Sequence, residues 1–142
     1  MSIKFRFNPQ KAVEVLLYLA ERCSDVYTAL KVLYFADKMH LARYGRLICG
    51  DSYVAMSHGP VPSGAYDLIK VARGDGWCHH NVPVEKAFTI EDNHITPLRR
   101  ADLEWLSESD IECLDDAIGE YGHLPFAELR KRSHDSAYLS AD

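Results

Sequence analysis

The sequence contains no uncharged hydrophobic run that approaches the roughly 20 residues needed to span a bilayer. Its first ten residues, MSIKFRFNPQ, lack the apolar core and small-residue cleavage site of a secretory leader. Both absences predict a cytoplasmic protein. The four cysteines are far apart and form no C-x-x-C pair. Because disulfides need an oxidising compartment, we expect free thiols at Cys23, Cys49, Cys78 and Cys113.

Catalytic motifs are also missing. The sequence has no phosphate-binding glycine loop, no G-x-S-x-G and no H-E-x-x-H. Cys78-His79-His80 is the strongest hint of a metal, but adjacent side chains point in different directions and closed zinc sites use two well-spaced ligand pairs. Other histidines are scattered, at positions 58, 94, 123 and 134. We therefore predict no catalytic residues, no metal, no cofactor and no enzymatic activity.

The net charge of −5 hides an asymmetry. The first 50 residues hold eight Lys/Arg against four Asp/Glu, and the remaining 92 hold eight against seventeen. Eight acids and no Lys or Arg lie between Ala101 and Gly122. A protein that coats nucleic acid normally shows the reverse balance, so nucleic acid is not the expected partner. The acidic stretch is either a solvated helix face or a patch for a basic partner, with Glu108, Glu112 and Asp116 as candidate contacts.

Five helices are expected from capping signals and apolar periodicity. Asn8-Pro9 is a strong helix start, and Gly45, Gly74 and Gly122 are helix ends. Ser107 with Asp110 resembles a capping box. Leu30, Leu33, Tyr34, Leu41 and Tyr44 form the expected apolar face of the second helix. The expected helices cover residues 9–23, 26–44, 63–71, 107–122 and 125–132.

The strand signals are shorter. Residues 53–58 alternate as in a strand, which Gly59-Pro60-Val61-Pro62 is expected to break. Residues 86–90 and 94–98 flank a three-residue loop and predict a β-hairpin. The predicted fold is a mainly helical α+β single domain over residues 1–142, with about five helices and a small antiparallel sheet.

Asp37 is the least expected residue in the second helix, because helical spacing places its carboxylate beside the buried face. A buried carboxylate is costly unless it is paired or hydrogen-bonded. His40, three residues later, can reach it. Two interpretations are open. In the first, Asp37 and His40 form an acid–base pair or part of a metal site. In the second, Asp37 is a structural contact that fixes the helix to the strand or to the Gly59 loop. We favour the structural contact, since no nucleophile or third ligand lies nearby.

The turn His58-Gly59-Pro60-Val61-Pro62 precedes the third helix. Backbone N–H groups at a helix start can bind an anion. The glycine and prolines are equally explained by a sharp change of direction after a strand.

Several linked motifs resemble the Panacea (SocA-like) antitoxin family, which also includes phage-associated proteins. They are LKVLYFAD at 30–37, HLARYG at 40–45, GDSYVA at 50–55 and HGPV at 58–61. Leu129 and Ser133-His134 resemble the family's closing motif, although Tyr138 stands near where a tryptophan is often expected. The resemblance assigns family-motif positions to Tyr34, Asp37, His40, Tyr53, His58, Gly59, Pro60 and Tyr66.

The resemblance implies an antitoxin that neutralises a cognate toxin by direct protein–protein binding. In the SocA type the antitoxin is also a proteolytic adaptor that delivers the toxin to the ClpXP protease. Two alternatives stay open at this point: a DNA-binding regulator of its own operon, favoured slightly by the basic first 50 residues, and a metal-dependent hydrolase using Asp37 and His40. The toxin's identity and the oligomeric state do not follow from the sequence.

Overall fold

The computed structural model of the chain describes residues 6–75 and 82–134. Over these residues it contains five α-helices and two antiparallel two-stranded sheets, which confirms the predicted mainly helical α+β class. Cys78-His79-His80 lies outside the described residues. No helix in the described part of the chain is long and apolar enough to cross a membrane.

Helix α1 (Pro9–Ala20) begins as predicted. The Asn8 side chain accepts a hydrogen bond from the Lys11 N–H, and Pro9 occupies the first turn. Every residue from Ala12 to Ala20 is buried, so this helix runs through the core. It ends three residues earlier than expected, because the N–H groups of Arg22 and Cys23 both turn back to the Leu19 carbonyl.

Helix α2 (Val26–Tyr44) has the predicted bounds, with Asp25 as N-cap and Gly45 as a left-handed C-cap. The predicted apolar face is wrong at its C-terminal end: Leu41 and Tyr44 are 51% and 48% exposed. Asp37 and His40 occupy the buried side there instead. Hydrogen-bond partners from the following loop and from helix α4 (Glu108–Tyr121) determine which side of α2 is covered, and a hydrophobicity pattern does not show them.

The sequence predicted that Gly59-Pro60-Val61-Pro62 breaks the strand before it. This prediction is wrong for strand β1 (Tyr53–Met56). Gly59–Pro62 is itself a strand, β2, which pairs antiparallel with β1 around a two-residue turn at Ser57 and His58. The Pro60 carbonyl points away from β1 and accepts a hydrogen bond from α2. Because the N and C=O of one residue face the same side of a strand, the absent Pro60 N–H costs no bond to β1.

The second hairpin joins β3 (Phe88–Glu91) to β4 (His94–Pro97). Its loop has two residues rather than the expected three: Asp92 and Asn93 have φ of 49° and 62°, as a type I′ turn requires. The residues before Ala87 form a short 3-10 turn (η1, Val84–Lys86) instead of extending the strand. Strand β4 also bridges to the residues just before α2, through a hydrogen bond from the Ile95 N–H to the Ser24 carbonyl.

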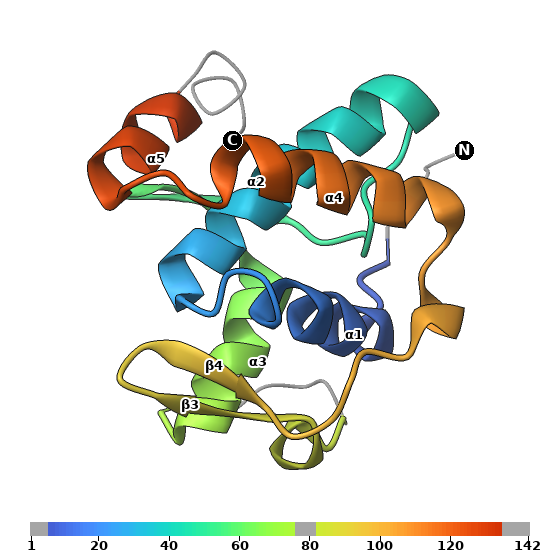
Figure 1. Cartoon of the computed structure of the whole chain (residues 1–142), viewed down its shortest axis with the longest axis vertical. Coiled ribbons are helices and arrows are strands. Elements are labelled where there is room, and N and C mark those ends of the chain that lie inside the picture. The colour runs from blue at the N-terminus through green and yellow to red at the C-terminus, as the bar shows by residue number, and fades with distance from the viewer. Residues whose placement is uncertain (1–5, 76–81, 135–142) are drawn as a thin grey trace.

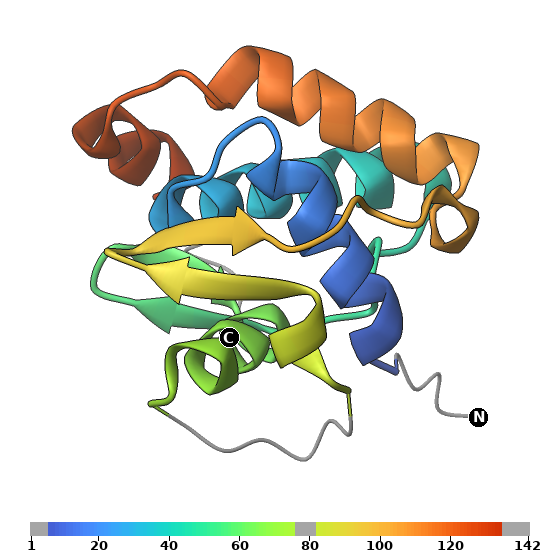
Figure 2. The ribbon, with the colours of Figure 1, turned by 60° about the horizontal axis from the view of Figure 1, so that its bottom comes forward.

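The remaining helices match the predictions closely. Helix α3 (Ser63–Arg73) ends at the left-handed Gly74, α4 starts with the Ser107–Asp110 capping box, and α5 is Phe126–Ser133. A short 3-10 turn, η2 (Leu103–Trp105), precedes α4. Helices α4 and α5 cover one side of α2, and α4 runs along its outer surface (Figures 1 and 2). Helix α3 and the β3–β4 hairpin lie at the other end of the molecule, next to α1 (Figure 1).

Candidate functional site

Asp37 is on the inner side of α2 and only 2% of it is exposed. One carboxylate oxygen accepts the Ile48 N–H at 2.8 Å, and the other accepts the Tyr53 hydroxyl at 2.6 Å. Burial raises the pKa of Asp37 to about 6, although both hydrogen bonds act in the opposite direction. Asp37 therefore joins α2 to β1 and to the loop before it. The nearby Tyr34 ring is also buried, 5.5 Å from the Tyr53 ring.

The proposed contact between Asp37 and His40 is not formed. His40 is fully buried, and its Nδ1 donates to the Arg46 carbonyl at 2.8 Å. Its Nε2 lies 2.9 Å from the Ser109 hydroxyl and 3.3 Å from the Asp110 carboxylate. Each side chain is held by a different segment, so the acid–base pair on which the hydrolase alternative depended is wrong. No group of three or more potential metal ligands occurs in the described ranges 6–75 and 82–134.

Asp110 is the point where three elements meet. Its buried carboxylate contacts Lys11 of α1 at 2.7 Å and Arg46 of the loop after α2 at 3.2 Å, and it accepts the Ser107 N–H at 2.9 Å. Burial alone would raise the pKa of Asp110, but the hydrogen bonds from Lys11 and Ser107 bring it below its ordinary value. His40 and Asp110 therefore position α4 against α2.

Lys31 is the buried charge that the sequence analysis missed at this site. Only 1% of it is exposed, and its Nζ donates to the Pro60 carbonyl at 2.7 Å. The same Nζ lies 5.3 Å from the centre of the Tyr27 ring. Burial lowers the pKa of Lys31 to about 8. Gly59, with φ +110°, lets the hairpin approach: a Cβ there would lie 2.8 Å from Lys31 Nζ and 2.6 Å from the Ser133 hydroxyl of α5.

The tip of the β1–β2 hairpin is held by α2 and α5. The Tyr27 hydroxyl donates to the His58 carbonyl at 3.0 Å, and Arg130 donates to the Ser57 carbonyl at 3.2 Å. The Phe126 ring lies tilted against Tyr27 and edge-on to His58, with 4.4 and 5.2 Å between the ring centres. His58 is exposed here, so it contributes a surface position rather than a core contact.

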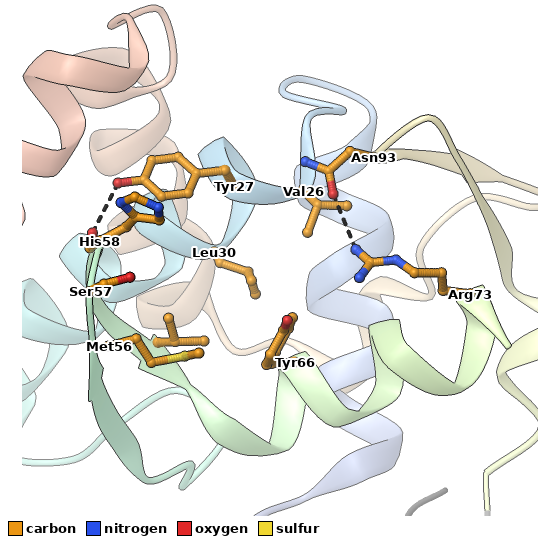
Figure 3. Close-up of a pocket in the computed structure, with 10 residues that line it drawn as sticks. Val26, Tyr27, Leu30, Met56, Ser57, His58, Tyr66, Arg73 and Asn93 are labelled. Carbon is orange, nitrogen blue, oxygen red and sulfur yellow. Dashed lines mark hydrogen bonds between the residues drawn. The ribbon is translucent and has the colours of Figure 1, made fainter. Parts of the chain in front are cut away.

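Beside this tip lies an open pocket of about 220 Å³, shown in Figure 3. Two family-motif positions, His58 and Tyr66, line it. Helix α2 supplies one wall, the hairpin a second, and α3 with the β3–β4 turn the remainder. Its lining residues are Val26, Tyr27, Leu30, Met56, Ser57, His58, Val61, Tyr66, Arg73 and Asn93.

The start of α3 does not offer an anion site. Asp51, 5% exposed, accepts the Gly64 and Ala65 N–H groups at 2.8 and 2.9 Å. A carboxylate from the preceding loop thus already satisfies the first turn of the helix. Burial raises the pKa of Asp51, although its three backbone hydrogen bonds act against this. The anion-binding interpretation of the turn before α3 is therefore wrong.

The acidic stretch is used partly inside the molecule. Arg43 of α2 contacts Glu112 and Asp116 of α4 at 2.8 Å each, and the Tyr44 hydroxyl donates to Glu112 at 2.7 Å. Glu108 is exposed at the start of the same helix. Together with the Lys11 and Arg46 contacts to Asp110, these pairs join the basic N-terminal half to the acidic C-terminal half. They also weaken the charge argument for DNA binding.

Three buried charges were not anticipated from the sequence, although two of them, Lys31 and Glu14, had a signal there. Lys31 interrupts the apolar run of α2, and Glu14 interrupts that of α1. Glu14 is 3% exposed and is held by Arg99 through two contacts of 2.8 Å. Asp51 could have been inferred only from the fold, because the helix that it caps begins 12 residues later.

Comparison with known proteins gives one match. A family model described as "Antitoxin SocA-like, Panacea domain" matches residues 30–138, which include most of the pocket and all eight family-motif positions. No curated protein and no solved structure matches the chain.

Proposed function

Because the chain belongs to the SocA-like antitoxin family of the Panacea domain, we propose that it is an antitoxin that neutralises a cognate toxin by direct binding. The family match agrees with the resemblance drawn from the sequence motifs. Helix α1 lies outside the matched residues, but it is buried against α3 and β4. We therefore propose that α1 belongs to the same single domain as the matched part.

The observation that carries this proposal, beside the family match, is the exposed apolar surface around the β1–β2 hairpin. Val54, Met56 and Phe126 are 49%, 42% and 49% exposed, and the pocket of Figure 3 opens next to them. A patch of large, solvent-exposed apolar side chains on a protein surface typically marks a site of protein–protein contact. The Asp37 and Lys31 contacts hold the hairpin that carries this surface on α2, whereas His40 holds α4 on α2, so all three have structural roles.

The proposal includes proteolytic delivery, in which the bound toxin is passed to the ClpXP protease. The support for this part is the family alone. Its test is the half-life of purified toxin with ClpXP in the presence and absence of this chain. Faster degradation with the chain supports an adaptor; an unchanged half-life restricts the function to neutralisation by binding.

The main experiment uses the reading frame adjacent to this gene. Expression of that frame alone should stop growth, and co-expression of this chain should restore it. The two products should also co-purify in a complex whose stoichiometry is measured by light scattering. If the product of the adjacent frame is toxic, but this chain neither restores growth nor binds that product, the proposal is contradicted.

A further inference from the structure

We propose that the pocket beside the β1–β2 hairpin is the toxin contact, and that it takes a bulky apolar side chain of an extended toxin segment next to a carboxylate. This inference rests on the proposed antitoxin function and adds the place and chemistry of the interface. The occupant follows from the size, the length and the charge of the site.

The size of the pocket favours a protein side chain. A volume near 220 Å³ lies below the roughly 300–1,000 Å³ typical of sites that enclose small molecules. Leu30 and Tyr66 face the space from two helices, and Met56 closes it from the hairpin (Figure 3). These walls suit one large apolar side chain.

The site also continues along the surface. A second hollow of about 260 Å³ shares Met56, Val61 and Tyr66 with the first and extends over Val54, Ser63 and the Asp67–Lys70 ion pair. The two hollows adjoin at these shared residues, and we refer to the pair as the groove between the hairpin and α3. An elongated groove fits a length of chain better than a compact ligand.

Charge defines the second part of the occupant. Among the ten described residues that line the pocket, Arg73 is the one with a permanent charge. Asn93 accepts one of its N–H groups at 3.1 Å, and Asp75 lies 3.6 Å away. A guanidinium has five donors and pairs best with a carboxylate, often through two parallel hydrogen bonds. An acidic group next to the inserted apolar side chain therefore complements this end of the site.

The site is preorganised for binding. Three hydrogen bonds hold the hairpin against two helices: those from Tyr27 and Lys31 of α2 and the one from Arg130 of α5. A surface that is already rigid loses little conformational entropy when it binds a partner. The contacts of the inserted side chain and of its acidic neighbour then contribute more of their energy to the affinity.

Two variants test the inference, and each has a matched control. Met56→Asp places a charge on the apolar wall, and its control is Leu98→Asp, at a side chain that is 53% exposed outside the groove. Arg73→Glu reverses the charged end of the groove, where the arginine is half-buried, and its control is Arg100→Glu, at an exposed arginine outside the groove. The probe is the purified product of the adjacent toxin frame, and the readout is the dissociation constant, with thermal unfolding as the check of folding.

We expect Met56→Asp and Arg73→Glu each to weaken toxin binding at least tenfold, while both controls bind as the unaltered chain does. Reversal of one acidic residue on the toxin should restore binding to Arg73→Glu alone. If Met56→Asp does not fold, Arg73→Glu and its rescue carry the test. Unaltered affinity in both groove variants would overturn this inference and leave the antitoxin function standing. Failure of the unaltered chain to bind would instead overturn the proposed function.

Discussion

The Tyr53 hydroxyl donates a 2.6 Å hydrogen bond to the buried carboxylate of Asp37, and the Ile48 N–H binds the other oxygen. Both donors are neutral, so they satisfy the carboxylate without an opposite charge. Burial consequently raises the pKa of Asp37 to about 6. The pair fixes β1, and through it the pocket, onto α2.

Removing this carboxylate should destabilise the fold. Asp37→Ala leaves the Ile48 N–H and the Tyr53 hydroxyl without their partner, which costs roughly 1–3 kcal/mol. Asp37→Asn keeps the shape and an acceptor for Ile48, and its amide can donate to Tyr53. We expect urea unfolding at neutral pH to show a loss for Asp37→Ala and little or no loss for Asp37→Asn. Equal stability of Asp37→Ala and the unaltered chain would contradict the role given to Asp37.

The same residue predicts a dependence on pH. The folded carboxyl keeps its proton up to about pH 6, whereas the unfolded one releases it near 3.8, so between these values the folded state binds more protons. Stability of the unaltered chain relative to Asp37→Asn should therefore rise as the pH falls from 6 to 4, by up to roughly 3 kcal/mol. Denaturant midpoints of both proteins across this range measure it. A difference that does not change with pH would show that Asp37 is charged throughout.

Local sequence signals predicted most of the helices of this fold. The Asn8 cap, Gly45 and the Ser107–Asp110 box each act through residues within one turn of the helix end, so their effect is visible in the sequence. Strand β2 was missed because its prolines were interpreted as a break. The pairing of β2 with β1 is possible because the backbone nitrogen of Pro60, which has no hydrogen to donate, faces away from β1. Only the assembled sheet shows this orientation.

Gly59 should tolerate no side chain. Gly59→Ala adds about 1–2 kcal/mol of backbone strain at φ +110°. Its Cβ would also press on Ser133 and Lys31, and such overpacking adds roughly 1–3 kcal/mol. Gly74→Ala is the matched control, because its φ is +87° and nothing lies within 4 Å of its Cβ. Thermal unfolding should show a larger loss for Gly59→Ala; equal losses would mean that the hairpin can move away from α5.

Lys31 predicts the opposite pH response to that of Asp37. The folded ammonium releases its proton near pH 8, whereas the unfolded one holds it up to about 10.5, so the unfolded state binds more protons in between. Stability of the unaltered chain relative to Lys31→Met should rise from pH 8 to 10.5, by up to roughly 3 kcal/mol. Methionine keeps the apolar stem and does not titrate. Parallel denaturation curves at pH 7.5, 9 and 10.5 measure the difference, and a difference that stays the same at all three pH values would contradict the role given to Lys31.

The candidate site was predictable only in part. The motif residues His58 and Tyr66 line the pocket, and Leu30, correctly predicted as a core residue, also faces it, whereas Arg73 was not singled out. The pocket forms where α2, the hairpin, α3 and the β3–β4 turn meet, so its lining comes from positions as distant as Val26 and Asn93. Neighbouring positions in the sequence carry no signal for such a meeting point.

The acidic residues of α4 should affect how fast the toxin arrives. Surface charges outside a contact also steer an approaching partner of opposite charge, so they mainly change the association rate, which falls as salt screens them. Reversing Glu108, Glu112 and Asp116 to Lys should therefore slow association with a basic toxin. Since Glu112 and Asp116 pair with Arg43, this variant also loses contacts inside the molecule.

A charge-swapped variant separates the two effects. Arg43→Glu combined with Glu112→Lys and Asp116→Lys rebuilds the α2–α4 ion pairs in the opposite sense and lowers the negative charge of α4, which keeps Glu108, Asp115 and Glu120. Stopped-flow association at 50 mM and 500 mM salt should be slower for this variant at low salt, with the difference shrinking at high salt because charges farther apart than about a Debye length are screened. The Glu108→Lys single variant, outside the Arg43 pairs, should show a smaller effect of the same sign. If the swapped variant binds as fast as the unaltered chain, the acids of α4 act only to hold α4 on α2.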